Sequence, residues 1–294
     1  MLYGMTLTPL TLDDSPEIGR RLDAIGMHLS EYSFPNLYLF RNTHEYHTVQ
    51  TPHGFFVSGV TYDKKRYLMP MMSPEKSEKE CFQELKGLLA GGEWDFIFPV
   101  PEEWLPCFDE TEFSRDSSPD DTDYLFFTEK MKTYPGKKMH KKKNLLNQFL
   151  RSHEALLVPL TDDVVDDARG ILEIWQDTTP QELAASDYHQ CLEALEKHSE
   201  LALVGAMAFA DDEPAGFVLG EALNNDTFTI HFAKADIRFK GVYQFLFSRF
   251  ACDFCPDYTY MNLEQDMGSE GLRKTKVSYR PDLMAQKYRI ALKA

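Results

Sequence analysis

A short internal repeat places the strongest constraint on how this chain folds. Residues 8–14 (TPLTLDD) return as residues 158–163 (VPLTDD). In each copy a short apolar stretch runs through Pro-Leu-Thr into acidic residues and then into a helical pattern, which is typical of a strand followed by an N-capped helix. The repeat therefore predicts two similar halves, and 294 residues are enough for two domains of ordinary size.

The second copy has the clearer pattern of helices and strands. After its first strand, helices are predicted over residues 164–176 and 188–197, followed by three strands over 201–209, 215–223 and 227–235. A helix over 241–254, a strand over 258–263, a helix over 268–279 and a closing strand over 284–292 complete it. An antiparallel meander followed by alternating strands and helices predicts an α/β (α+β) fold with a mixed sheet and helices on both faces.

The first copy predicts a similar but looser order. It has a helix over residues 15–24, hairpin strands across 46–69, a helix over 76–89, a strand over 94–100, a short helix over 101–108 and a last strand over 123–128. The acidic stretch 109–123 is interpreted as a solvated loop. The break at 134–136 divides the chain into domains 1–135 and 136–294, the second beginning with a connecting helix over 137–151.

Composition excludes several functional classes. The net charge of −16 disfavours a protein that coats nucleic acid or an anionic membrane. No stretch of 18 apolar residues and no signal-peptide pattern is present, so we expect a cytoplasmic protein without an integral membrane segment. The five cysteines lack the spacing of a disulfide framework. Cys252 and Cys255 form a C-x-x-C pair without partners for a zinc site, and we predict a structural role for them and no metal.

A basic turn follows the third strand of the meander. The chain passes from that strand through residues 236–240 to a predicted helix, and free amide groups at a helix N-terminus can hold a phosphate. The candidate donor-binding residues are Lys234, Arg238, Lys240, Gly241 and Tyr243. An ordinary capped turn is the alternative.

Polar residues alternate at the end of the strand 258–263. Asn262, Glu264 and Asp266 are expected to share one face at the carboxyl end of the strand, where α/β sheets bind ligands. Glu264 or Asp266 could accept a proton from an attacking amine, and Tyr279 or Lys274 could protonate the leaving group. Alternatively, Asp266 caps the next helix and Glu264 pairs with a basic residue of that helix.

Two further positions on the meander are candidates. His231 alternates with apolar neighbours on the third strand and is either a structural histidine or a substrate-binding residue, together with Asn262. Glu221, near the end of the neighbouring strand, is a second candidate base.

A lysine run stands out against the acidic chain. Residues 137–143 contain Lys137, Lys138, Lys141, Lys142 and Lys143, and apolar residues at helical spacing follow. The run could bind tRNA phosphates, a CoA phosphate or an acidic partner. It could equally be a solvated face that balances nearby acidic residues.

Four segments carry a resemblance to known families. Residues 238–243 (RFKGVY) resemble the acyl-CoA loop of GNAT acyltransferases, except that Tyr243 replaces a small residue. Residues 30–41, 136–144 and 262–281 resemble signatures of a bacterial tandem-GNAT family related to the C-terminal synthase domain of phosphatidylglycerol lysyltransferases. The resemblance implies two GNAT-like domains, and the donor we expect is acyl-CoA or aminoacyl-tRNA.

The first half has no equivalent of this loop. The matching segment, residues 68–74, lacks glycine and basic residues and cannot hold a diphosphate in the same way. We therefore expect this half to contribute the acceptor side, with Tyr32, Asn36, Tyr38 and Arg41 as substrate-binding candidates.

Two functions follow from these observations. The first is an acyl- or aminoacyltransferase acting on an amine or hydroxyl of a small molecule, peptide or lipid, with a base, an oxyanion donor from strand amides and no metal. The second is a non-catalytic protein that keeps the GNAT scaffold to bind a ligand or partner.

Overall fold

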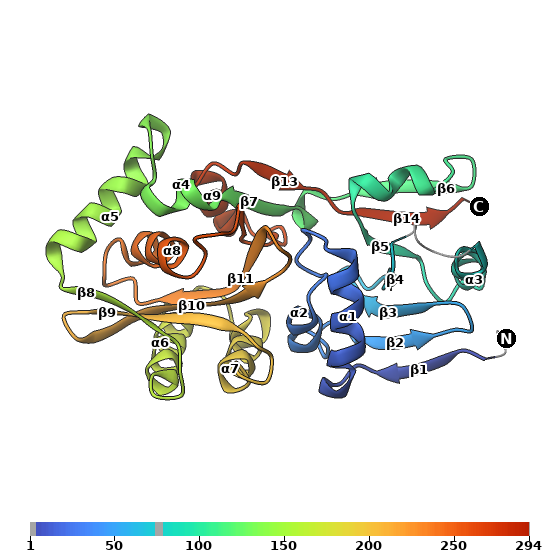
Figure 1. Ribbon diagram of the computed structural model, residues 1–294, viewed down its shortest axis with the longest axis horizontal. Helices are drawn as coiled ribbons and strands as arrows, with labels where there is room; N and C mark the ends of the chain where they lie inside the picture. The colour runs from blue at the N-terminus through green and yellow to red at the C-terminus, as the bar shows by residue number, and fades with distance from the viewer. Residues whose placement is uncertain (1–3, 74–78, 294) are drawn as a thin grey trace. The chain divides into compact units, whose positions relative to one another are not determined.

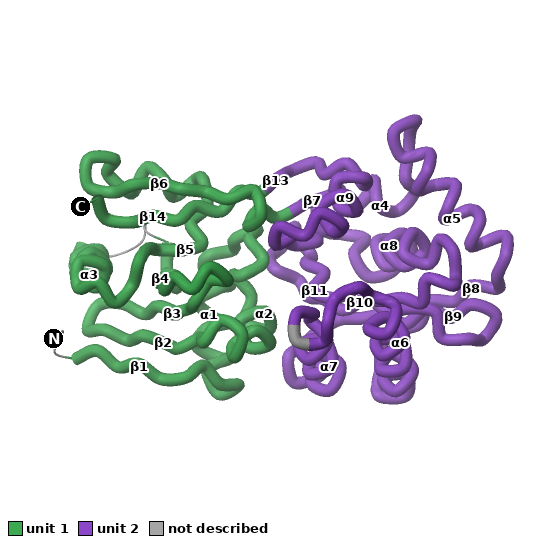
Figure 2. The backbone as a smooth tube through the Cα atoms, turned by 180° about the vertical axis from the view of Figure 1, so that it is seen from behind, with its two compact units in different colours: residues 1–123, 285–294 green, residues 124–284 purple. Residues whose placement is uncertain are grey.

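The chain forms two compact units, and the last residues of the chain return to the first unit. The computed structural model describes residues 4–73 and 79–293, and its two units comprise residues 1–123 with 285–294 and residues 124–284 (Figure 2). The chain leaves the first unit after Asp123 and returns to it at Ala285. The boundary expected near residue 135 lies inside the second unit, after its first helix.

The first unit contains a seven-stranded sheet in the order β1-β2-β3-β4-β5-β14-β6 (Figure 1). Its strands are β1 (Thr6–Pro9), β2 (His47–Gln50), β3 (Phe55–Val60), β4 (Arg66–Pro70), β5 (Phe96–Val100), β6 (Phe113–Ser117) and β14 (Tyr288–Leu292). Only the β4–β5 pair among them is parallel. The helices are α1 (Ser15–Ile25), α2 (Phe34–Leu39) and α3 (Lys79–Ala90).

Two expectations for this unit require correction. The stretch 109–123 is not a continuous solvated loop, because it contains β6, which pairs with β14 from the end of the chain. The predicted closing strand 284–292 is two strands, β13 in the second unit and β14 in the first. Residues 74 and 76–78, part of the expected loop 68–74 and helix 76–89, lie outside the described residues.

A buried charge cluster fixes the start of β14 in the first unit. The Lys287 ammonium is fully buried and lies 2.7 Å from Asp123 Oδ1 and 2.6 Å from Glu31 Oε2. Burial raises the pKa of Glu31 to about 7, against the lowering effect of Lys287. The ion pairs of this cluster therefore join three segments that are far apart in the sequence, those of Glu31, Asp123 and Lys287.

The second unit has its own seven-stranded sheet in the order β13-β7-β12-β11-β10-β9-β8. Its strands are β7 (Asp123–Phe127), β8 (Ala155–Pro159), β9 (Val204–Ala210), β10 (Glu213–Ala222), β11 (Thr227–Ala235), β12 (Tyr260–Asn262) and β13 (Leu283–Ala285). Its helices are α4 (Thr128–Thr133), α5 (His140–Ser152), α6 (Val165–Thr178), α7 (Tyr188–Glu196), α8 (Val242–Asp253) and α9 (Glu270–Ser278). The predicted α/β class with mixed sheets is confirmed.

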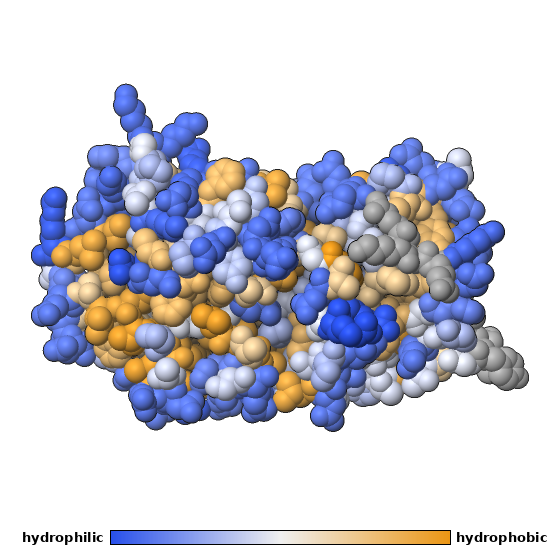
Figure 3. Space-filling model, viewed as in Figure 1, coloured by the Kyte–Doolittle hydropathy of each residue, from blue (hydrophilic) through white to orange (hydrophobic). Residues whose placement is uncertain are grey.

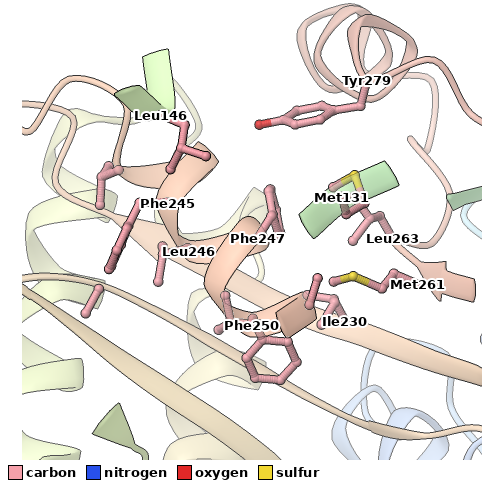
Figure 4. Close-up of a cluster of buried hydrophobic side chains, with 14 of the residues drawn as sticks. Met131, Leu146, Ile230, Phe245, Leu246, Phe247, Phe250, Met261, Leu263 and Tyr279 are labelled. Carbon is pink, nitrogen blue, oxygen red and sulfur yellow. The ribbon is translucent and has the colours of Figure 1, made fainter. Parts of the chain in front are cut away.

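Helices cover both faces of this second sheet. In Figure 1, α8 lies on one face of β10 and β11, while α6 and α7 lie on the other. The α8 face carries the buried cluster of Figure 4, in which Ile230 of β11 and Met261 of β12 pack with Phe245 and Phe250 of α8. Burial of these side chains holds β11 and β12 in a fixed register beneath α8.

Candidate active site

The structure brings three ionisable side chains together on β10, β11 and the end of β12. The His231 imidazole is buried, its Nδ1 lies 2.8 Å from Glu264 Oε1, and its Nε2 lies 3.0 Å from Glu221 Oε1. We call Glu221, His231 and Glu264 the His231 centre. Its members were singled out separately from the sequence, and their mutual contact is a finding of the structure.

A β-bulge aims His231 at its partners. Across β10 and β11, Gly220 pairs with Ile230 and Leu219 pairs with Phe232, which leaves His231 as the extra residue. A bulge redirects a side chain that strict alternation would place elsewhere. A Cβ atom on Gly220 would lie 2.0 Å from the Thr229 carbonyl oxygen, so the close pairing beside the bulge requires glycine.

Glu264 reaches His231 from an unusual backbone conformation. Its φ is 59°, in the left-handed region that L residues other than Asn and Asp rarely adopt. The turn is held by the Glu264 amide, which donates to Asn262 Oδ1 at 2.7 Å, and by Lys276 Nζ, which donates to the Glu264 carbonyl at 3.1 Å. Such backbone strain persists where surrounding contacts enforce it, and it is concentrated at functional sites.

The two carboxylates determine the charge of the imidazole. Burial by itself disfavours imidazolium, but the hydrogen bonds and charges of Glu221 and Glu264 raise the pKa of His231 to about 10. His231 therefore carries its proton at neutral pH and donates to both carboxylates. The group able to accept a proton at this centre is a carboxylate and not the imidazole.

Asp266 occupies a separate, fully bonded site. It is buried, accepts two hydrogen bonds from Arg273 at 2.7 and 2.8 Å, one from Tyr124 Oη at 2.6 Å and one from the Gly268 amide at 3.0 Å. Although burial acts to raise it, the pKa of Asp266 is lowered by these donors. β12 ends at Asn262, so the strand alternation does not continue, and Asp266 holds α9 in place while Glu264 contacts His231.

Lys274 and Tyr279 lie in different surroundings. Lys274 is 74% exposed on α9 and pairs with Glu270 one helical turn away. Tyr279 is buried, and its hydroxyl accepts a hydrogen bond of 2.6 Å from Gln244 Nε2 in the first turn of α8. Lys142 of α5 lies over the Tyr279 ring, 3.6 Å from its centroid.

The cations of the expected donor loop are largely paired. Lys234 Nζ contacts both carboxylate oxygens of Asp187 at 2.7 and 2.8 Å and lies over the Trp175 ring. Arg238 is 71% exposed, yet it pairs with the buried Asp236 at 2.6 Å. Despite burial, this guanidinium holds the pKa of Asp236 below its usual range.

Gly241 has a packing role in the same loop. It precedes α8 with φ at 97°, and a Cβ atom there would lie 2.3 Å from the Leu145 carbonyl oxygen of α5. Lys240 is exposed and Tyr243 is half-buried in the first turn of α8. The space that the absent side chain of Gly241 leaves is therefore occupied by the backbone of α5.

The lysine run lies on the surface at the start of α5. Lys137, Lys138, Lys141 and Lys143 are exposed and Lys142 is half-buried, and within the described chain none of the five forms an ion pair with a carboxylate. Figure 3 shows hydrophilic side chains over this end of α5, at the upper left. In a chain with 47 acidic residues against 31 basic ones, such a segment presents concentrated, uncompensated positive charge.

The substrate-binding candidates of the first unit are mostly core residues. Tyr32 is buried and donates to the Pro99 carbonyl at 2.9 Å, and Asn36 and Tyr38 are buried in α2. Arg41 lies over the Tyr38 ring at 3.9 Å and donates to the Tyr38 carbonyl at 2.6 Å.

Two other kinds of feature are absent from the described residues, 4–73 and 79–293. No group of three His, Cys, Asp or Glu side chains in these ranges could hold a metal ion, and no helix in them is long and apolar enough to cross a membrane. An open hollow of about 550 Å³ lies beside α4, lined by Phe127, Lys130, Tyr258 and their neighbours. It lies at the other end of β12 from Glu264 and contains none of the predicted site residues.

Comparison with known proteins gives one family match and several similar folds. The family described as "Phosphatidylglycerol lysyltransferase, C-terminal" matches residues 23–291. An uncharacterized protein of Mycoplasmoides gallisepticum is 26% identical over 208 residues, which are 66% of this chain and 63% of that protein. The chain thus spans less than two thirds of that relative.

Three solved structures share the fold along most of the chain. A conserved protein of unknown function from Bacteroides thetaiotaomicron has a TM-score of 0.86 at 24% identity, covering 98% of this chain and 100% of that one. L-PGS from Bacillus licheniformis has a TM-score of 0.63 at 12% identity, covering 95% and 91%. FemX has a TM-score of 0.63 at 8% identity, covering 98% and 97%.

Proposed function

Because this chain belongs to the phosphatidylglycerol lysyltransferase C-terminal family, we propose that it transfers an aminoacyl group from aminoacyl-tRNA to an amine or hydroxyl acceptor. Acyl or aminoacyl transfer is the general chemistry that the family match supports. The observation that carries the proposal is the His231 centre, in which a buried imidazolium is held between two carboxylates at the end of β12. Groups with such strongly perturbed pKa values are concentrated at functional sites.

The centre suits nucleophilic attack on an ester carbonyl. The acceptor amine or hydroxyl must lose a proton as it attacks, and we assign this proton to Glu264, which lies in the turn directly after β12. His231 donates to Glu264 and fixes the orientation of its carboxylate. When Glu264 takes the acceptor proton, His231 and Glu221 keep the buried charge balanced.

The distribution of positive charge favours tRNA over CoA as the donor. Two of the loop cations that would contact a CoA pyrophosphate, Lys234 and Arg238, are paired with carboxylates, and Gly241 packs against α5. The lysine run, in contrast, has no carboxylate partner in the described chain. Clustered free lysines suit the repeated phosphates of a nucleic acid.

A non-catalytic binding protein on the same scaffold is the second candidate. The observation that favours it is Asp266, whose carboxylate is fully occupied by structural hydrogen bonds. Glu264 is different, since its partner is the buried histidine of a neighbouring strand and not a helix-capping amide. Loss of transfer activity on changing Glu264 would separate the two functions.

Donor binding tests the proposal directly. Fluorescence anisotropy with labelled tRNA, and calorimetry with CoA, can be measured at 50 and 200 mM salt for the wild type, a Lys141, Lys142 and Lys143 to Glu variant, and Arg238→Glu. We expect tRNA binding that weakens steeply with salt and is lost in the triple variant, with no binding of CoA. Binding of CoA that depends on Arg238, without binding of tRNA, would overturn the donor assignment.

A further inference from the structure

The strand β8 lies at one edge of the sheet of the second unit, and its side chains are apolar. Among residues 4–73 and 79–293, β9 is the only strand that pairs with it. Leu156 is 56% exposed, and Leu157 and Val158 are half-buried. Figure 3 shows hydrophobic side chains gathered over this end of the second unit, at the left. An exposed, uncharged edge of this kind is a site at which a further strand can pair.

The other edge strands of the two described sheets are less suited to such pairing. β6 carries charges at Arg115 and Asp116, and β13 has only three residues. Charge and shortness are common ways in which proteins protect the edge of a sheet. β1 holds one aliphatic residue, Leu7, between two threonines. β8 is therefore the edge that offers the most apolar surface to a partner.

The ladder with β9 determines which backbone groups of β8 face outwards. The Asp211 amide donates to the Glu154 carbonyl at 2.9 Å, just before the first residue of β8. Along an antiparallel ladder, hydrogen-bonded pairs alternate with pairs that make no such bonds. The N–H and C=O groups of Ala155 and Leu157 therefore point away from β9. Pro159 is the next outward residue, and it has no N–H to donate.

We propose that the edge of β8 binds the same edge of a second copy of this chain, so that two β8 strands pair antiparallel about a twofold axis. Two identical antiparallel strands are self-complementary, because every contact is made twice. The seven-stranded sheets of the two second units then form one continuous sheet. The contact involves one short strand and its flanks, so the dimer is reversible.

One register uses all the outward backbone groups of Ala155 and Leu157. When Leu156 lies on the twofold axis, Ala155 of each copy is opposite Leu157 of the other, and each such pair exchanges two hydrogen bonds. Pro159 lies outside the paired residues, where no donor is required. The two Leu156 side chains meet across the axis, with their Cα atoms about 4.5 Å apart, and shield each other from water.

The charges beside β8 are complementary in this arrangement. Arg151 is exposed at the end of α5, just before the strand, and Asp162 and Asp163 are exposed just after it. Antiparallel pairing brings the beginning of β8 in one copy next to its end in the other, so the arginine of each copy approaches the aspartates of its partner. Glu154 is opposite the apolar Val158 and meets no like charge. A second copy therefore fits both the apolar and the charged parts of this edge.

The mass of the full chain in solution tests the dimer. Sedimentation equilibrium is measured from low to high micromolar concentration for the wild type, Leu156→Lys, Leu157→Pro and a matched control, Leu7→Lys. Leu7 is 40% exposed on β1, an edge strand of the other sheet. We expect the wild type and the control to dimerise equally, and Leu156→Lys, which places two ammonium groups at the axis, to weaken the dimer by at least about tenfold.

The second variant removes a hydrogen bond and adds no charge. Leu157→Pro deletes an outward N–H and keeps the bonds to β9, so it should also weaken the dimer. Circular dichroism shows that each variant is folded under the conditions of the mass measurement.

A disulfide test locates the contact. A Cα separation of about 4.5 Å lies within the range that a disulfide spans, so Leu156→Cys should form a covalent dimer on oxidation. The wild type controls for the native cysteines, which are buried or half-buried, and Leu7→Cys controls for random collision. A monomeric wild type, a Leu156→Lys variant that dimerises like the wild type, or a dimer that Leu156→Cys does not link would each overturn the proposal.

Discussion

Replacement of Gly241 by alanine separates a packing role from a donor-binding role. The residue lies just before α8 with φ at 97°, where an L side chain is strained by about 1–2 kcal/mol. Its new Cβ would also lie 2.3 Å from the Leu145 carbonyl oxygen and 3.1 Å from Phe149 Cβ. Contact of that kind forces α5 and α8 apart, and overpacking typically costs about 1–3 kcal/mol.

Together these effects predict a loss of about 2–5 kcal/mol in the stability of the second unit. Thermal unfolding followed by circular dichroism should therefore show a melting temperature lower by roughly 5–15 °C. Gly170→Ala is the matched control, because this glycine lies inside α6 with nothing within 4 Å of its Cβ position. The control should stabilise the helix by about 0.5–1 kcal/mol. Unchanged stability of Gly241→Ala, with only donor binding weakened, would refute the packing explanation.

Three further predictions concern buried charges. Lys287→Met leaves two buried carboxylates without their ammonium. It should lower the free energy of unfolding of the first unit by about 3–5 kcal/mol, measured by urea unfolding. A variant as stable as the wild type would show that the cluster does not hold β14. Because folding raises the pKa of Glu31 to about 7, the folded unit binds a proton that the unfolded chain has lost, so this group's stabilisation falls from roughly pH 4 to 7. Glu31→Gln should flatten that fall, and an unchanged pH profile would contradict the assignment. Asp266→Asn should lower the free energy of unfolding by about 2–4 kcal/mol, because it weakens the pair with Arg273. Thermal unfolding measures the loss, with Glu270→Gln as an exposed control. Equal effects of the two substitutions would contradict a structural role for Asp266.

Local sequence patterns predicted much of the second half. The strand and helix order from residue 155 to 278 follows from apolar periodicity and turn residues, because each element there is defined by its own pattern. These local patterns did not predict which sheet the strand at the end of the chain joins. The pairing of β14 with β5 and β6 depends on contacts far apart in sequence and on the burial of Lys287, which no local pattern reveals.

The candidate site was predictable residue by residue but not as an arrangement. Glu264 and His231 stand out as polar residues on apolar strands, yet their contact depends on the bulge at Gly220 and on the left-handed backbone of Glu264. The assumption of strict alternation placed Asp266 beside Glu264. The strand ends before both residues, and Arg273, from the next helix, takes the Asp266 carboxylate.

The central claim is tested most directly by the rate at which labelled amino acids leave a pool of charged tRNA. The assay combines wild type, Glu264→Gln or the surface control Glu270→Gln with a lipid and small-molecule extract as the acceptor source. We predict that wild type and Glu270→Gln accelerate the transfer, and that Glu264→Gln is about 10²–10⁴-fold slower with unchanged tRNA affinity, as expected for loss of a general base. No acceleration by the wild type, or a Glu264→Gln variant as fast as the wild type, would contradict the account.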